Sequence, residues 1–154
     1  MTGISNIPVQ DASWEALEGL AKHILEPVVK HLGFPSLTVG FCSPALQRRM
    51  RSGIAPSLDQ HAAHELNSQG RLVCPRGGAA CDFFVEGCGS LSVAKWVVGH
   101  LDYDRLYFYG PDRPIHVSWS MNPTRRIVMV RKSGSTARRI PYNITAPRFL
   151  SLGL

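Results

Sequence analysis

The chain lacks the segments that would tie it to a membrane or to export. No apolar run approaches the ~20 residues that a membrane-spanning helix needs. The first residues, MTGISNIPVQDASWE, contain neither the basic region nor the apolar core of a secretory signal. We therefore expect a cytoplasmic protein with no membrane contact, although a phage enzyme released through holins would begin in the same way.

Paired cysteines are also missing. The four cysteines, Cys42, Cys74, Cys81 and Cys88, form no C-x-x-C pair, which argues against a zinc ribbon. A chain of 154 residues can bury a sufficient core without disulfides. We expect reduced thiols.

Acidic residues are absent from the last part of the chain. Residues 123–154 contain no Asp or Glu but seven basic residues: Arg125, Arg126, Arg131, Lys132, Arg138, Arg139 and Arg148. Nucleic acid or another anionic partner could bind such a stretch. The alternative is a pair of strands whose outward face is rich in arginine and simply solvated.

No internal repeat and no low-complexity linker divides the chain, so we expect a single domain over residues 1–154. Helical spacing of apolar residues predicts a helix over 13–32, with one turn loosened by Pro27. Shorter helices are expected from Ser43-Pro44 to about Met50, within 57–67, and from a Ser90 cap to about His100.

Five segments read as strands: 36–41, 79–85, 105–109, 114–120 and 126–132. Helices dominate the first half of the sequence and strands gather in the second half. This order indicates an α+β fold, a small antiparallel sheet with helices packed on it, and not a doubly wound parallel sheet.

Four residues have the chemistry of zinc ligands: His61, His64, Asp82 and His116. Asp82 lies within the apolar strand AACDFFV, and His116 lies in the similar setting PIHVSW. A carboxylate buried there needs a partner, and a catalytic zinc ion with three protein ligands would provide one. The alternative is a core aspartate bonded to backbone amides and a core histidine bonded to a carbonyl. The segment HAAHE does not help to decide, because it is not the H-E-x-x-H motif.

The order of these motifs adds information. ILEPVVKHLGFPSLTVGFCSPALQ, then DQH, GAACDF, YDRLYF and PIHVSW, resembles the zinc D-alanyl-D-alanine carboxypeptidase family, which has the hedgehog/DD-peptidase fold. The family reads approximately I-L-E-P-L-R, S-G-Y-R-S-P, S-x-H-x-x-G-x-A-x-D, D-x-L and W-x-H-[VI]-S. The resemblance covers residues 24–120.

The resemblance implies that His61, Asp82 and His116 are the three zinc ligands. Asp104 matches the D-x-L position and is expected to be structural. The segment between His61 and Gly78 is longer than in the family and contains His64, which is the alternative first ligand.

Two positions depart from the family. Cys42 stands where the family has the arginine that holds the substrate carboxylate and the oxyanion, and a thiol cannot replace a guanidinium. Other arginines would have to substitute for it: Arg48, Arg49, Arg71 or Arg76. The family's general base is a glutamate before the last histidine, where this chain has Arg113 and, one residue earlier, Asp112.

These observations lead to a first hypothesis, a zinc-dependent hydrolase of peptide bonds, with peptidoglycan-type peptides ending in D-alanine as the implied substrate. Zinc would activate a water molecule, and Asp112, or Glu65 from the inserted segment, would accept its proton. Asp112 has a second interpretation as an ordinary turn residue after Gly110-Pro111.

The alternative hypothesis is a non-catalytic zinc-containing binding module derived from this fold, with an anionic partner on the basic C-terminal stretch. A fourth protein ligand, such as His64, Cys74 or Cys81, would close the zinc site and favour this hypothesis. A nucleophilic role for Cys42, which precedes a helix start, is a further and weaker alternative.

Overall fold

A six-stranded sheet forms the centre of the molecule in the computed structural model, which describes residues 3–50, 55–132 and 139–153. The strands lie in the order β1-β2-β4-β3-β5-β6. Neighbouring strands are antiparallel except for β3 and β5, which are parallel. The strand bounds are β1 Pro35–Val39, β2 Ala79–Val85, β3 Arg105–Phe108, β4 Ile115–Trp119, β5 Arg126–Lys132 and β6 Arg139–Ile144.

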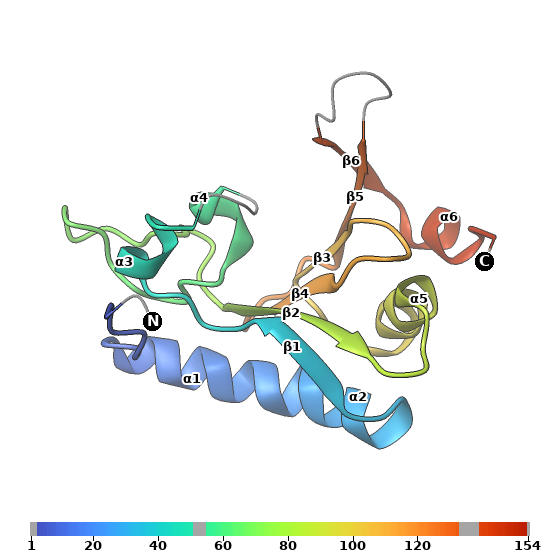
Figure 1. Cartoon of the computed structure of the whole chain (residues 1–154), viewed down its shortest axis with the longest axis horizontal. Coiled ribbons are helices and arrows are strands. Elements are labelled where there is room, and N and C mark those ends of the chain that lie inside the picture. The colour runs from blue at the N-terminus through green and yellow to red at the C-terminus, as the bar shows by residue number, and fades with distance from the viewer. Residues whose placement is uncertain (1–2, 51–54, 133–138, 154) are drawn as a thin grey trace.

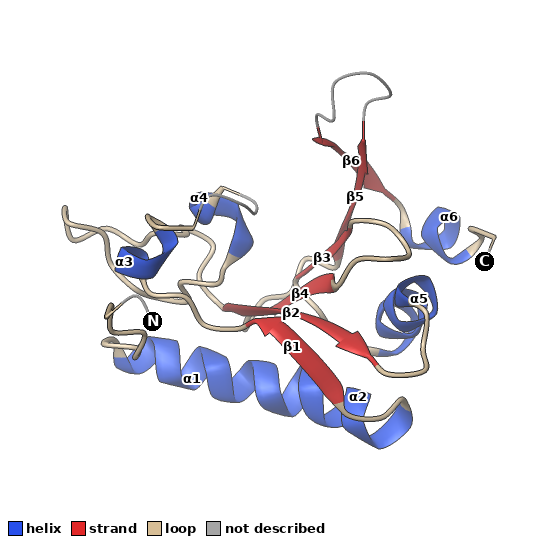
Figure 2. Cartoon of the chain, in the orientation of Figure 1, coloured by secondary structure: helices blue, strands red, loops and turns tan. Residues whose placement is uncertain are grey.

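The longer helices pack on one face of this sheet, and the described part of the link between β1 and β2 contains only short helices (Figures 1 and 2). The helix bounds are α1 Asp11–Leu20, α2 Glu26–His31, α3 Pro44–Gln47, α4 Pro56–Asp59, α5 Ser90–His100 and α6 Ala146–Leu150, with a π-helical segment, η1, over Ala21–Leu25. The α+β class is therefore confirmed, with a mostly antiparallel sheet. Among the described residues, no helix is long and apolar enough to cross a membrane.

The loosened turn expected near Pro27 is present. The segment η1 joins α1 to α2 without a break, and the Glu26 N–H donates to the carbonyl of Ala21, five residues back. Proline has no N–H to donate, so a wider turn just before it costs little. Asp11 to His31 therefore run as one long helical segment.

The two faces of the sheet differ because side chains alternate along a strand. In β2 and β4, Cys81, Phe83, Ile115 and Val117 belong to the apolar core. The core also takes in α1, which packs on β2 and β4, and α5, which packs on β2 and β3. The residues between them in sequence, including Asp82 and His116, therefore project from the opposite face.

Some local expectations need correction. Gly89, and not Ser90, occupies the position before α5, and the Ser90 hydroxyl instead donates to the carbonyl of Arg113 at 2.6 Å. The helix expected within 57–67 is reduced to α4, followed by turns, and the helix from Ser43 ends at Gln47. Strand β6 and helix α6 were not predicted; Phe149 of α6 is fully buried against Phe108.

Candidate metal centre

Sheet register brings the first two candidate ligands together. Asp82, in the middle of β2, lies directly opposite His116 of β4. Facing residues on antiparallel strands project to the same side, so the two side chains meet. The Nδ1 atom of His116 lies 2.8 Å from Oδ1 of Asp82.

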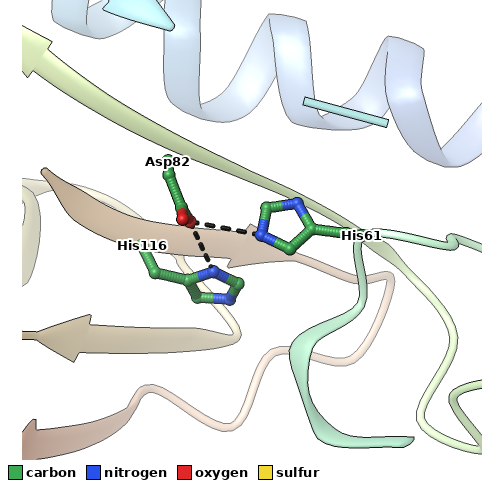
Figure 3. Close-up of side chains that lie close together, drawn as sticks. All are labelled: His61, Asp82 and His116. Carbon is green, nitrogen blue, oxygen red and sulfur yellow. Dashed lines mark hydrogen bonds and ion pairs between the residues drawn. The ribbon is translucent and has the colours of Figure 1, made fainter. Parts of the chain in front are cut away.

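The third ligand comes from the link between β1 and β2. His61 follows Gln60, whose backbone adopts the left-handed conformation at φ 59° and turns the chain sharply after α4. The Nε2 atom of His61 lies 3.2 Å from the same Asp82 oxygen. Ligand atoms of His61, Asp82 and His116 all lie within 4.8 Å of one another, as Figure 3 illustrates.

The orientation of the His61 ring is fixed by a hydrogen bond on the side away from Asp82. Its Nδ1 lies 2.9 Å from the carbonyl oxygen of Gly40, which can only accept a hydrogen bond, so Nδ1 carries a proton. In the neutral ring Nε2 then carries a lone pair, which is directed at the Asp82 carboxylate. Two electron-rich atoms in this arrangement repel unless a proton or a cation lies between them. A backbone carbonyl behind a ring nitrogen is also the usual support of a metal-bound histidine.

His116 is enclosed more completely. It is fully buried, and its ring packs against that of Tyr107 in a T-shaped arrangement with a centroid distance of 5.0 Å. Its Nε2 has no hydrogen-bond partner in the described part of the chain. Nδ1 is the ring nitrogen that lies beside Asp82.

The charges of the three groups fit a cation. Burial disfavours ionisation of Asp82, but the imidazoles of His116 and His61 beside it outweigh burial and hold the pKa of the carboxyl well below its usual range. Burial lowers the pKa of His116. For His61, burial is outweighed by the carboxylates of Asp82 and Asp59, which raise the pKa of the imidazole. One carboxylate and two imidazoles are a donor set that zinc prefers.

The cluster lies in a cavity of about 430 Å³. Apart from Asp82, the acidic residue in the cavity wall is Asp59, which is 7% exposed and accepts a hydrogen bond from the His61 N–H at 3.2 Å. Burial raises the pKa of Asp59 and that of the Tyr109 hydroxyl, which also lines the cavity. Two guanidinium groups, those of Arg113 and Arg139, complete the charged lining.

His64, the alternative first ligand, lies elsewhere. Its Nε2 accepts a hydrogen bond from the Gly78 N–H at 3.0 Å, and it lines a second cavity of about 300 Å³. Cys74 donates its thiol to the carbonyl of Ser57, and Cys81 projects into the apolar core. Of the described residues, only His61, Asp82 and His116 form a group that could hold a metal ion.

The two carboxylates considered as general bases are placed differently from Asp59. Asp112 is exposed in the turn between β3 and β4 and does not line the cavity. Glu65 is buried, and its Oε1 accepts hydrogen bonds from Val9, Gln10 and Ser13 near the start of α1. Asp59 was missed, although it stands two residues before His61 in sequence.

Asp104, which is buried, and Arg76, which is partly exposed, form a structural ion pair. The Arg76 guanidinium donates to both carboxylate oxygens of Asp104, which has no exposed surface and also accepts from Gln60 and Thr124. Ser118 donates in turn to the Gln60 side chain at 2.7 Å. This network holds the residue next to His61 and keeps Arg76 away from the cavity.

Cys42 is part of the cavity wall. Cys42 is buried there, and burial raises the pKa of its thiol, which disfavours a nucleophilic thiolate. Arg48, Arg49 and Arg71 are exposed and do not line the cavity. Arg113 and Arg139 are the cations placed there instead.

Three of the seven basic residues near the C-terminus have partners within the fold. Arg125 donates to the carbonyls of Val98 and Leu101 at the end of α5, Arg126 contacts Asn143, and Arg131 stacks over Tyr142. Arg138 lies outside the described residues, as does the side chain of Lys132. These contacts give Arg125, Arg126 and Arg131 a structural role.

Comparisons with protein-family models, with curated proteins and with solved structures find no match for this chain.

Proposed function

We propose that this chain is a zinc-dependent hydrolase of peptide bonds. The observation that carries the proposal is the convergence of His61 Nε2, His116 Nδ1 and Asp82 Oδ1, with His61 fixed by Gly40 so that its lone pair faces the carboxylate. Three protein ligands are typical of catalytic zinc, whereas structural zinc usually has four. The arrangement supports an open site, because His64, Cys74 and Cys81 point elsewhere.

Bound zinc would supply a water molecule that ionises near neutral pH and would polarise the substrate carbonyl. The chain's own residues have the remaining tasks. Hydrolysis requires a group that takes a proton as water oxygen bonds to the carbonyl carbon, and that returns one to the leaving amine as the C–N bond breaks. Asp59 is positioned for both transfers, since its carboxylate lies in the cavity wall beside His61. Asp112, one residue before the position of the family's glutamate, is the alternative base, but it is exposed and does not line the cavity.

The oxyanion that develops on the carbonyl needs donors in a sheltered site. Arg113 and Arg139 line the cavity and would take the place of the arginine that the family has at the position of Cys42. The Tyr109 hydroxyl, whose pKa is raised, stays protonated at neutral pH and can donate a hydrogen bond.

The finer assignment rests on the sequence resemblance to the zinc D-alanyl-D-alanine carboxypeptidases and their hedgehog/DD-peptidase fold. It favours peptidoglycan-type peptides ending in D-alanine as substrates. The altered set of arginines makes another peptide an equally suitable substrate, so the test has to include both classes.

The experiment compares the zinc-loaded protein with the same protein after chelator treatment. Both are incubated with D-alanine-terminated muropeptides and with a pool of mixed L-peptides, and new termini are identified by mass spectrometry. We expect cleavage only with zinc, its loss in Asp82→Ala, and its retention in His64→Ala. Stoichiometric zinc without cleavage in either pool would contradict the hydrolase and favour the binding module.

A further inference from the structure

Strand β1 forms one edge of the sheet. Ser36, Leu37 and Thr38 are exposed, and the Leu37 side chain is 52% exposed although it is apolar. An edge strand offers backbone N–H and C=O groups on its outer side, and these groups can pair with another extended chain. Phe34, just before the strand, is 83% exposed and adds to the apolar surface there.

This edge leads directly to the candidate ligands. Val39 pairs with Asp82 in the β1–β2 register, and the Thr38 hydroxyl donates to the carbonyl of Asp82 at 3.2 Å. Thr38 and Val39 both line the cavity that contains the three ligands. The next residue, Gly40, holds His61 through its carbonyl. One end of the open edge is therefore part of the site itself.

The opposite edge of the sheet is less suitable for pairing. Strand β6 has Pro141 near its middle, and proline lacks the N–H that a ladder requires. Arg139 at its start lines the cavity. Strand β6 can therefore serve as an internal control for peptide pairing at β1.

We propose that β1 binds the substrate backbone as an added strand, so that the preferred substrate is an extended peptide segment and not a dipeptide. This inference rests on the proposed peptide hydrolase. Backbone pairing supplies affinity that is independent of side chains, and Leu37 and Phe34 would contact the peptide's apolar side chains. Regular β1–β2 pairing is interrupted between Leu37 and Val39. This is the part of β1 from which the scissile bond of a paired peptide would have to reach the candidate ligands.

The probes are peptides that carry their own zinc-binding group. Mercaptoacetyl-Thr-Val-Thr-Val-amide extends in one chain direction from the metal, and acetyl-Thr-Val-Thr-Val-hydroxamate extends in the other. Mercaptoacetamide and acetohydroxamate are the short controls. Dissociation constants are measured on the zinc-loaded full chain, each probe is N-methylated at one amide at a time, and hydrogen exchange of β1 and β6 amides is followed by NMR.

We expect one extended probe to bind at least about tenfold more tightly than its short control, since a net backbone hydrogen bond is worth roughly a factor of five. N-methylation should weaken binding at alternate amides only, because successive residues of a strand face opposite sides. Exchange should slow in β1 and not in β6.

Binding of the short controls without any gain from extension would overturn the pairing and leave the hydrolase proposal intact. A methylation scan with no alternation, or protection of β6 in place of β1, would also overturn it. Failure of the short controls to bind the zinc-loaded protein would contradict the proposed zinc hydrolase, and the β1 inference would fall with it.

Discussion

At the scale of single residues, the candidate site depends on how three side chains are held. Asp82 and His116 were identifiable in sequence because each interrupts an apolar strand, and their partnership follows from facing positions on β2 and β4. His61 could not be preferred over His64 from spacing alone. Hydrogen bonds to the backbone distinguish the two histidines. The Gly40 carbonyl holds His61 in the cluster, and the Gly78 N–H holds His64 outside it.

The proton acceptor is testable with one pair of variants. Asp59→Asn keeps an oxygen that can accept from the His61 N–H but cannot take a proton, so we expect kcat to fall by about 10²–10⁴-fold. Asp112→Asn, in the exposed turn, is expected to leave kcat nearly unchanged. Zinc content measured in parallel should be the same in both variants. A large loss of kcat in Asp112→Asn alone would reverse the assignment.

A second residue-scale prediction concerns Gly78, the glycine of the G-x-A-x-D motif. Its φ of +77° is unfavourable for other residues, and a Cβ atom there would lie 2.3 Å from the carbonyl oxygen of Trp119. The backbone at Gly78 or at Trp119 would have to move to relieve this contact. We therefore expect Gly78→Ala to lower the free energy of unfolding by about 2–4 kcal/mol.

Gly99 is the matched control. It lies within α5 and has open space around the position of a Cβ, so Gly99→Ala should raise stability by about 0.5–1 kcal/mol. Urea unfolding monitored by circular dichroism measures both changes. Equal stability of Gly78→Ala and wild type would show that the backbone around Gly78 moves easily enough to accommodate a Cβ atom.

At the scale of elements, the sequence predicted the strands that are rich in apolar residues and missed those stabilised by their partners. Residues 79–85 form β2 as expected. Strand β6, RIPYNI, contains a proline and has little alternation, and it exists because β5 pairs with it along its whole length. Helix α6 is short, and its stability comes from the burial of Phe149 and not from its own sequence.

The link between β1 and β2 is anchored by Asp104, and this gives a pH prediction. Burial favours the neutral carboxyl, but Arg76, Thr124 and Gln60 outweigh it and lower the pKa of Asp104. A carboxyl whose pKa is lower in the folded state binds protons more readily when unfolded, so its contribution is present above the unfolded pKa of about 4. That contribution is lost as the pH falls through the lower folded value.

We therefore expect the urea midpoint of Asp104→Asn to depend less on pH than that of wild type below about pH 5. At pH 7 the variant should be less stable, because Arg76 loses its ionic partner and is left with its contacts to Ser120 and Asn122. Midpoints measured from pH 3 to pH 7 test this. Parallel curves for the two proteins would show that Asp104 does not act through its charge.

At the scale of the whole molecule, the strand order was beyond sequence reasoning. Placing β4 between β2 and β3, and β5 beside β3 in parallel, depends on contacts between segments far apart in the chain. The α+β class could be predicted because it depends only on which elements are present. The hedgehog/DD-peptidase fold is defined by its strand order and connections as well as by its class, so it remains a proposal based on the sequence resemblance.

The three candidate ligands come from widely separated segments, so a metal bound by them would stabilise the whole fold. A metal that binds only the folded chain adds about 2.7 kcal/mol at a hundred times its dissociation constant. For a domain of this size we expect zinc to raise the melting temperature by about 5–10 °C. Scanning calorimetry with and without zinc tests this, with Asp82→Ala as the variant in which the increase should vanish.

Acid should weaken zinc binding, because protons compete for the imidazole nitrogens. The carboxylates around His61 raise the pKa of its imidazole, so competition begins at a higher pH than for a free histidine. Titration calorimetry in buffers of different ionisation enthalpy should detect proton release that increases as the pH falls toward 6. Affinity that does not change between pH 8 and pH 6 would argue against histidine ligands.

The most direct measurement is the zinc content of wild type, His61→Ala and His64→Ala after exposure to zinc and gel filtration, determined by elemental mass spectrometry. We expect one equivalent of zinc in wild type and in His64→Ala, and almost none in His61→Ala. Zinc retained by His61→Ala, or lost from His64→Ala, would contradict the assignment of His61 as a zinc ligand.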